Sequence, residues 1–539
     1  MNITAVLSML HEPAGQSGSA TRRFRGEAPL AWTLFRLARC PAISKTVVLC
    51  WEDQAEAVAP IAAEQGIEYI ARSARMCLPH LDSVSAARRW ADGWRGGPLW
   101  TCEFDRGFYG PWVAEIAQKT EAEAVLLVDP SAGLVDPDLI SSLIEHAASQ
   151  SGVDFYFSQA APGLSGVLLR RSIIGQLATD STHPGTLLGY LPDLPMRDPI
   201  SAPSCVPVAT SLARTPHRFT LDSERQIDRI ASATVHLNGQ LISTEAEQLV
   251  RFLDASSDSS TLPREVVLEL NTRRAARPIY SAATHIRIDR PDLSGDAARI
   301  LIQELASADD LRLVLGGVGD PLLYPDLFAM VDEAKRAGIG AIALETDLLG
   351  VEPGVIDQLA DSPVDIISVN FPAICRATYQ AIMGVDGFKL VMENLAKLIS
   401  RRQSNRRGTP LVVPTFIKTT GNMAEMEAWY DHWLRVLGCA VINGPSDFAE
   451  KIADVSVAQM EPPRRQACAR LARRLTVLCD GRVVSCEQDI LGEQSLGRIG
   501  ENSIQNIWTG AAAALGRDHA AGQWNRHPIC AKCKEWHRP

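Results

Sequence analysis

The sequence lacks any long run of apolar residues. None of its 539 residues belongs to a stretch that approaches the roughly 20 apolar residues of a membrane span. Residues Met1–Leu7 also lack a basic segment followed by a long apolar core, so we expect no secretory signal. Positive charge is scarce as well, because the net charge is −10. That balance argues against nucleic acid or an anionic membrane as the main partner, and we expect a cytoplasmic protein.

The cysteines divide into two groups. In a reducing compartment the twelve thiols should be free or bound to metal rather than paired as disulfides. We interpret the scattered cysteines as small core residues; these are Cys40, Cys50, Cys77, Cys102, Cys205, Cys375 and Cys439. The other five all lie from Cys468 onward. Only this second group needs a chemical explanation.

A chain of this length should fold as several domains. Residues 1–245 alternate short β-branched runs with helical patterns, which predicts a parallel sheet with covering helices. The predicted strands and helices are Ile3–Leu10, Leu30–Arg39, Thr46–Cys50, Gln54–Gln65 and Ala124–Asp129. Asp136 and Pro137 suit the N-cap and first position of another helix.

A Ser- and Asp-rich stretch at 254–260 suggests a linker. Beyond it, residues 262–450 again alternate strands and helices, and the repeat length predicts a (β/α) barrel or partial barrel with its site at the carboxyl ends of the strands. The predicted strands are Val266–Asn271, Leu311–Leu315, Ala341–Thr346, Ile366–Phe371 and Leu411–Ile417. Residues 451–539 form the third predicted domain.

Four cysteines of the last segment carry the strongest chemical signal, namely Cys468, Cys486, Cys530 and Cys533. Four soft thiolates suit a [4Fe–4S] cluster or a tetrahedral zinc ion. Residues 475–486 predict a hairpin with Asp480-Gly481 as its turn, and 488–489, 496–500 and 504–508 follow it. This order resembles the SPASM domain of radical S-adenosylmethionine (SAM) enzymes. The resemblance implies one [4Fe–4S] cluster on the four thiolates, with zinc as the alternative, and leaves Cys479 out.

The sequence Gly316-Gly317-Val318-Gly319-Asp320-Pro321 follows the second strand of the middle segment. It resembles the glycine-rich element that radical SAM enzymes place against the SAM amino group, and 345–347, 364–369 and 377–388 continue the family's order. The resemblance implies a radical SAM-like barrel in which Gly317, Gly319 and Asp320 bind the cofactor.

The first strand and its loop, residues 268–281, depart from that family. Radical SAM enzymes have C-x-x-x-C-x-x-C here, whereas this chain has Arg274, Pro278 and Ser281. None of the three is a good iron ligand, so we expect no SAM-cleaving cluster and regard SAM as a doubtful cofactor. Arg274, with Arg273 and Arg277, forms either an anion site or a set of ion-paired or solvated side chains.

The first segment begins with a strand, a loop rich in arginine and glycine, and the helix-like run 29–34. It resembles the sugar nucleotidyltransferases, in particular cytidylyltransferases. The resemblance implies that Arg22, Arg23 and Arg25 bind nucleotide phosphates and that Asp129 and Asp222 hold Mg²⁺. Glu27 stands where this family has a phosphate-binding lysine.

The sequence therefore predicts an α/β protein in three parts: a Rossmann-like nucleotidyltransferase (GT-A-like) domain, a degenerate radical SAM-like partial barrel and a SPASM module. We expect an iron–sulfur protein without radical chemistry that works in surface-polysaccharide or sugar-nucleotide metabolism through its first domain, which would bind a nucleotide or sugar-nucleotide. A non-catalytic binding module with a structural cluster and a non-radical SAM-binding enzyme remain alternatives, and nucleotidyl transfer by the first domain stays open. The sequence names no protein partner.

Overall fold

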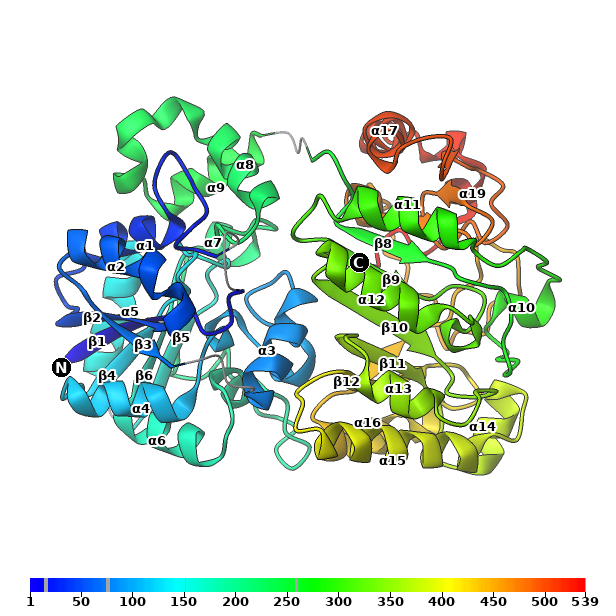
Figure 1. The fold of residues 1–539 in the computed structure, drawn as a ribbon, viewed down its shortest axis with the longest axis horizontal. Coiled ribbons are helices and arrows are strands. Elements are labelled where there is room, and N and C mark those ends of the chain that lie inside the picture. Colours follow the sequence, from blue (N-terminus) through cyan, green and yellow to red (C-terminus); the bar gives the residue numbers. More distant parts are fainter. Residues whose placement is uncertain (14–17, 74–77, 151, 257–259, 539) are drawn as a thin grey trace. The chain divides into compact units, whose positions relative to one another are not determined.

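The computed structural model describes residues 1–13, 18–73, 78–150, 152–256 and 260–538. It divides into two compact units, Met1–Ser259 and Ser260–Pro539 (Figure 1). Among the described residues, no helix combines the length and apolar character needed to cross a membrane. Cys77 lies outside the described residues.

The first unit is a mixed α/β domain. Its strands are β1 Ile3–Ser8, β2 Lys45–Trp51, β3 Glu68–Arg72, β4 Ala124–Leu127, β5 Phe155–Ser158, β6 Val167–Arg170 and β7 Cys205–Val206. Its α-helices are α1 Pro29–Leu37, α2 Ala55–Glu64, α3 Pro79–Arg89, α4 Gly110–Lys119, α5 Pro137–Ser149, α6 Arg171–Thr179, α7 Thr210–Arg214, α8 Glu224–Ala233 and α9 Ala246–Asp254. The strands and helices predicted in 1–129 are confirmed to within a few residues.

The seven strands of this unit form one sheet in the order β3-β2-β1-β4-β6-β5-β7. Helices α1, α2 and α5 cover one face and α4 and α6 the other (Figure 1). Strands β3, β2, β1 and β4 are parallel, but β6 is antiparallel to both β4 and β5. The prediction of a parallel sheet is therefore wrong for the part of the sheet that contains β6, because the short β5–β6 connection permits an antiparallel pairing.

Two helix starts in the first unit position the residues of its candidate site. Asp136 caps α5 by accepting from the N–H groups of Asp138 and Leu139, and Pro137 occupies the first helical position, which confirms the predicted cap. Ser223 caps α8 by accepting from the N–H of Gln226. Asp222 immediately precedes this cap, and Asp129 lies just beyond the end of β4. The start of α8 and the end of β4 therefore position the two carboxylates.

The second unit contains a nine-stranded sheet. Its strands are β8 Glu265–Leu268, β9 Arg312–Leu315, β10 Ala341–Thr346, β11 Ile366–Asn370, β12 Leu411–Ile417, β13 Val441–Asn443, β14 Arg474–Val477, β15 Arg482–Val484 and β16 Gly497–Arg498. Its α-helices are α10 Ala282–His285, α11 Gly295–Leu305, α12 Leu327–Ala337, α13 Val355–Asp361, α14 Arg376–Met383, α15 Phe388–Ser404, α16 Met426–Leu437, α17 Ile504–Ile507, α18 Ala513–Ala520 and α19 Pro528–Lys532.

The sheet of the second unit joins the two predicted C-terminal parts. Strands β8 to β13 are parallel neighbours in chain order, and β14 adds to β8 in parallel. Strands β14 and β15 then form the predicted hairpin, with Gly481 at positive φ in its turn. The predicted boundary at residue 450 is thus bridged by one sheet, and the three-part division stays a proposal.

The two faces of this sheet differ in character. Leu344 of β10 and Val369 of β11 belong to the large core that the outer helices cover. On β10 and β11 the alternate residues Glu345 and Ser368 point to the other face, where Glu345 is exposed.

Candidate functional site

Four thiols converge at the C-terminal end of the second unit. Cys468 precedes a short 3₁₀ turn, Cys486 follows β15, and Cys530 and Cys533 lie at α19. Burial, together with the neighbouring Cys533 and Cys468, raises the pKa of Cys530 to about 12. Burial also raises the pKa of Cys486, with contributions from Cys533 and Cys530. The four thiols therefore influence one another, and their role as a set of metal ligands stays a prediction.

Both arginines and carboxylates lie near these thiols. Arg465 donates to the Cys530 carbonyl at 2.6 Å and opposes the rise in the pKa of the Cys530 thiol. Arg470 acts in the same direction on Cys533. Four thiolates around an iron–sulfur cluster leave a net negative charge, which such arginines offset. Within the described ranges, no three His, Cys, Asp or Glu side chains are already arranged around a common metal position.

The remaining cysteines fall outside this set. Burial and the neighbouring Glu269 raise the pKa of Cys479 to about 12, and its N–H donates to Glu269. Cys479 therefore lies against Glu269, the residue directly after β8. Cys40, Cys50, Cys102, Cys205 and Cys439 are buried, as predicted. Cys375 is exposed, so its prediction as a core residue is wrong.

Arg274, which the sequence predicts to stand at the first cluster-ligand position of radical SAM enzymes, is held in an ion pair. Nε and Nη2 of Arg274 donate to the two carboxylate oxygens of Asp347 at 2.6 and 2.9 Å. Asp347 is almost fully buried, and Asn370 donates to it at 3.1 Å. Arg273 pairs with Asp292 at 2.6 Å. The hypothesis of an anion site is therefore wrong for these two arginines, because their charges are already neutralised.

The glycine-rich loop packs against the barrel. Gly317 has φ +113, a conformation that favours glycine. A Cβ on Gly319 would overlap the carbonyl oxygen of Asn271. Asp320 is buried and accepts from the Thr346 hydroxyl, the Asp347 N–H and the Leu322 N–H at 2.8–3.0 Å. Packing alone therefore explains why two glycines and an aspartate stand at these positions, and their role in binding a cofactor stays a prediction.

Asp320 and Asp347 also share one electrostatic environment. Burial and the nearby Asp347 raise the pKa of Asp320 to about 6, while Arg274 opposes that rise. The guanidinium of Arg274 consequently stabilises two buried carboxylates at the carboxyl ends of β9 and β10. In the resembling family this end of the barrel is the reaction centre.

The arginine loop of the first unit turns inward. Arg22 pairs with Glu224 at 3.0 Å, and its side chain is almost fully buried. Arg23 donates to the carbonyls of its own turn, and Arg25 donates to the carbonyl and hydroxyl oxygens of Thr234. Their predicted role in binding phosphates stays a prediction. In this structure Arg22 and Arg25 also hold the loop against the unit, whereas Arg23 is exposed.

Asp129 and Asp222 do come together, around a third residue that the sequence did not single out. Nη1 of Arg106 lies 2.7 Å from Oδ2 of Asp222 and 3.9 Å from Oδ2 of Asp129. Arg218 also pairs with Asp222. Although burial opposes it, Arg218 and Arg106 hold the pKa of Asp222 far below its usual range. The predicted pair of carboxylates thus exists, with a guanidinium between its members.

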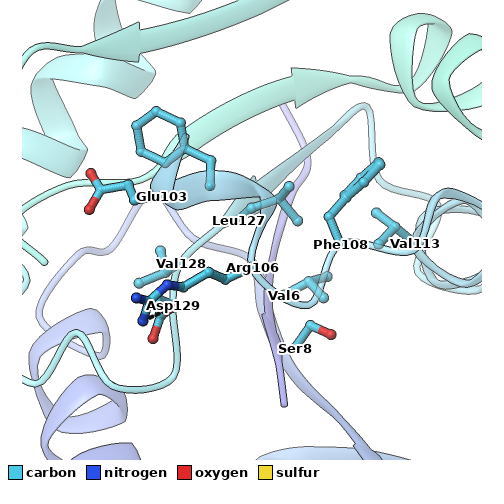
Figure 2. Close-up of a pocket in the computed structure, with 10 residues that line it drawn as sticks. Val6, Ser8, Glu103, Arg106, Phe108, Val113, Leu127, Val128 and Asp129 are labelled. Atoms are coloured by element: carbon cyan, nitrogen blue, oxygen red, sulfur yellow. Dashed lines mark ion pairs between the residues drawn. The ribbon is translucent and has the colours of Figure 1, made fainter. Parts of the chain in front are cut away.

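A small cavity adjoins this group. It is lined by Ser8, Glu103, Arg106 and Asp129 together with apolar side chains, and Figure 2 shows Arg106 and Asp129 side by side with Glu103 near them. Its volume of about 10 Å³ has room for a single water molecule at most. Burial raises the pKa of Glu103 to about 8. No substrate fits this space.

A larger cavity lies at the carboxyl end of β1, beside the arginine loop. Its volume is about 500 Å³, within the usual range for a small-molecule site. Met9, Ala20 and Ala57 supply an apolar part, whereas Glu12 and Asp53 supply carboxylates. This lining suits a base or a sugar better than a triphosphate.

Sequence reasoning missed Arg106 and Asp347. Asp347 ends the Glu-Thr-Asp sequence after a predicted strand, a position where functional residues gather in such barrels, so a signal for it existed. Arg106 lies in a short segment without periodicity, and no sequence signal marks it.

Comparisons with known proteins agree with the two C-terminal parts. Residues 279–420 match the family described as the radical SAM superfamily, and residues 468–534 match SPASM, described as an iron–sulfur cluster-binding domain. The chain therefore contains a radical SAM-type domain followed by a SPASM-type domain. The α/β fold class predicted from the sequence is confirmed.

Individual proteins resemble the chain more remotely. An uncharacterized protein of Treponema pallidum (strain Nichols) is 22% identical over 307 residues, which are 54% of this chain and 84% of the relative. The crystal structure of BtrN in complex with AdoMet and 2-DOIA has a TM-score of 0.36 at 15% identity, covering 50% of this chain and 93% of BtrN. A cytidylyltransferase structure from Leptospira borgpetersenii serovar Hardjo-bovis (strain JB197) has a TM-score of 0.35 at 13% identity, covering 48% and 97%. Similarities at this level assign no function.

Proposed function

We propose that this protein holds one [4Fe–4S] cluster on Cys468, Cys486, Cys530 and Cys533 and does not cleave SAM reductively. The observation that carries the proposal is the ion pair of Arg274 and Asp347. Arg274 stands where the first thiolate of the radical SAM cluster is expected, and its guanidinium is committed to a buried carboxylate. A permanent cation cannot replace an iron ligand, so the residues present do not fit that cluster.

The C-terminal thiols do fit an iron–sulfur cluster. They are four in number and free, and the pKa values of Cys486, Cys530 and Cys533 are each raised in part by other members of the set. Four cysteine thiolates are the usual ligands of a [4Fe–4S] centre. When bound, the cluster would supply either a redox centre or a structural link for a segment with little core of its own. Zinc remains the alternative metal, because tetrahedral zinc accepts the same four thiolates.

Metal analysis tests this proposal. Protein purified without air should contain about four irons and four sulfides per chain with broad visible absorption. Cys530→Ser should lose the iron, whereas the matched variant Cys479→Ser should keep it, because Cys479 lies against Glu269. One zinc ion and no colour would overturn the iron–sulfur assignment. About eight irons would show that a second cluster forms.

The absence of SAM chemistry has its own test. SAM binding in calorimetry that disappears in Asp320→Asn would favour a non-radical SAM enzyme, the alternative based on the glycine-rich loop. SAM cleavage to 5′-deoxyadenosine by reduced protein would contradict the main proposal outright. If neither SAM nor a nucleotide binds, the remaining function is a binding module with a structural cluster.

A second candidate function concerns the first unit: binding of a nucleotide or sugar-nucleotide, with a role in sugar-nucleotide or surface-polysaccharide metabolism. The cavity of about 500 Å³ favours it. Ala57→Trp should fill this cavity and abolish binding of a cytidine nucleotide or nucleotide-sugar. Ala63→Trp, on an exposed position of the same helix, should leave it unchanged. Equal binding by both variants would exclude the cavity as the site.

A further inference from the structure

The carboxylates of Asp129 and Asp222 are held together by a protein cation. Asp129 follows β4 and Asp222 precedes α8, so the end of a strand and the start of a helix bring the two carboxylates together. Nη1 of Arg106 lies within ion-pair distance of one oxygen from each, at 3.9 and 2.7 Å. A divalent ion shared by the two carboxylates would have to occupy the space that this nitrogen fills.

The charges of the group are already balanced. Two carboxylates face two guanidinium groups, because Arg218 also pairs with Asp222. The other titratable neighbours add little charge: burial lowers the pKa of His11 to about 4, which leaves it neutral, and raises the pKa of Glu103 to about 8. A divalent ion would therefore add two uncompensated positive charges to a buried site.

Space gives an independent argument. Mg²⁺ normally keeps several of its waters, whereas the cavity beside Arg106 and Asp129 has a volume of about 10 Å³. Oδ2 of Asp129 and Oε1 of Glu103 are buried in this region without a hydrogen-bond partner. A single bridging water would satisfy them, but a hydrated metal ion would not fit.

We propose that Arg106 takes the place of the divalent metal ion in the first unit. The unit keeps the two carboxylates expected of a metal site and neutralises them with its own guanidinium. Its folding, and the binding of any ligand, are then independent of Mg²⁺ and Mn²⁺. This inference concerns only Arg106 and its partners, so it stands whether or not the unit binds a nucleotide.

Manganese titration of the full-length protein tests the proposal, since carboxylates and water are ligands that Mn²⁺ accepts. Free Mn²⁺ is followed by its electron paramagnetic resonance signal. The wild type should show no site that depends on Asp222. Arg106→Ala leaves one cation for two carboxylates and opens the space between them, so it should bind about one Mn²⁺ per chain at least about tenfold more tightly than the wild type. Adding Asp222→Asn should abolish that binding.

Arg218→Ala provides the matched control. Like Arg106→Ala, this substitution removes one positive charge beside Asp222, but it leaves Arg106 between the carboxylates. We therefore expect no gain in Mn²⁺ binding. Equal gains in the two variants would overturn the proposal in favour of general electrostatics. A wild-type Mn²⁺ site that Asp222→Asn removes would overturn it as well, and so would a folded Arg106→Ala variant that binds no Mn²⁺. Should that variant not fold, Arg106→Met keeps the length of the stem and replaces it in the same titration.

Discussion

Arg274 and Asp347 form a bidentate ion pair at the carboxyl ends of β8 and β10, with donor–acceptor distances of 2.6 and 2.9 Å. The two residues are 73 positions apart in the chain. In the first unit, Arg106 and Asp222 form a comparable pair across 116 positions. In each unit, a guanidinium thus neutralises a largely buried carboxylate that lies far from it in the chain. Both ion pairs compensate a negative charge that burial would otherwise make costly.

Replacing Arg274 by Ala should destabilise the second unit by about 3–5 kcal/mol, because it leaves the Asp347 carboxylate buried without a counter-charge. Native-state hydrogen exchange of peptides from β10 measures this loss locally. Arg274→Met combined with Asp347→Leu should recover most of it, since replacing both members of a buried pair is often close to neutral.

Arg273 serves as the control for that experiment. Its pair with Asp292 is half exposed, so Arg273→Ala should change the stability by no more than about 1 kcal/mol. An equally small effect of Arg274→Ala would contradict the view that its ion pair holds this end of the barrel together.

Local signals in the sequence were sufficient for many elements. Strands β10 and β12 begin and end where their hydrophobic runs do, and Asp136 with Pro137 marks the start of α5. The Asp480-Gly481 turn identifies the hairpin of β14 and β15 in the same way. Each of these depends on residues within a few positions of one another.

Long-range pairing could not be predicted from the same signals. The addition of β14 to β8 joins strands about 200 residues apart, and the antiparallel β6 follows from its connection rather than from its own pattern. The site shows the same division. The spacing of the C-terminal cysteines predicts one set of metal ligands. The pairing of Arg106 with Asp222 instead depends on how two segments 116 residues apart meet in the fold.

The glycine at position 319 allows a second prediction. Gly319→Ala should destabilise the second unit by about 1–3 kcal/mol, because the added Cβ would overlap the Asn271 carbonyl. Thermal unfolding of the purified variant measures this. Gly516→Ala, within α18 and with open space around it, should be neutral or slightly stabilising. If both variants unfold like the wild type, the loop is more adaptable than its packing implies, and a ligand-binding role for Gly319 becomes the better explanation.

The Asp320 carboxylate is predicted to hold the start of the loop after β9. Asp320→Ala removes the acceptor for Thr346, Asp347 and Leu322 at once, and each buried donor left unpaired costs roughly 1–3 kcal/mol. Asp320→Asn keeps the shape and one acceptor, so it should lose less stability. Urea unfolding of the two variants should therefore rank wild type, Asn and Ala in decreasing order, and an Ala variant as stable as Asn would contradict this assignment.

Glu103 should make the stability of the first unit fall as the pH rises. Burial raises the pKa of this carboxyl to about 8, against about 4.3 in an unfolded chain. Between these values the folded protein holds a proton that the unfolded chain has lost, so stability declines with pH by up to about 1.4 kcal/mol per pH unit. Glu103→Gln removes the titrating group and keeps an acceptor for the Gly163 N–H. Urea midpoints between about pH 5 and 8 should therefore fall more steeply for the wild type than for this variant.

The matched control for the pH series is Glu52→Gln, at an exposed position of the same unit, and it should follow the wild-type slope. Parallel slopes for wild type and Glu103→Gln would mean that Glu103 is ionised in the folded protein. Glu103, Asp129 and Asp222 would then place three negative charges around Arg106 and Arg218. The site would carry one uncompensated negative charge, which would favour a metal ion. The pH series thus tests, without any metal, one premise of the role assigned to Arg106.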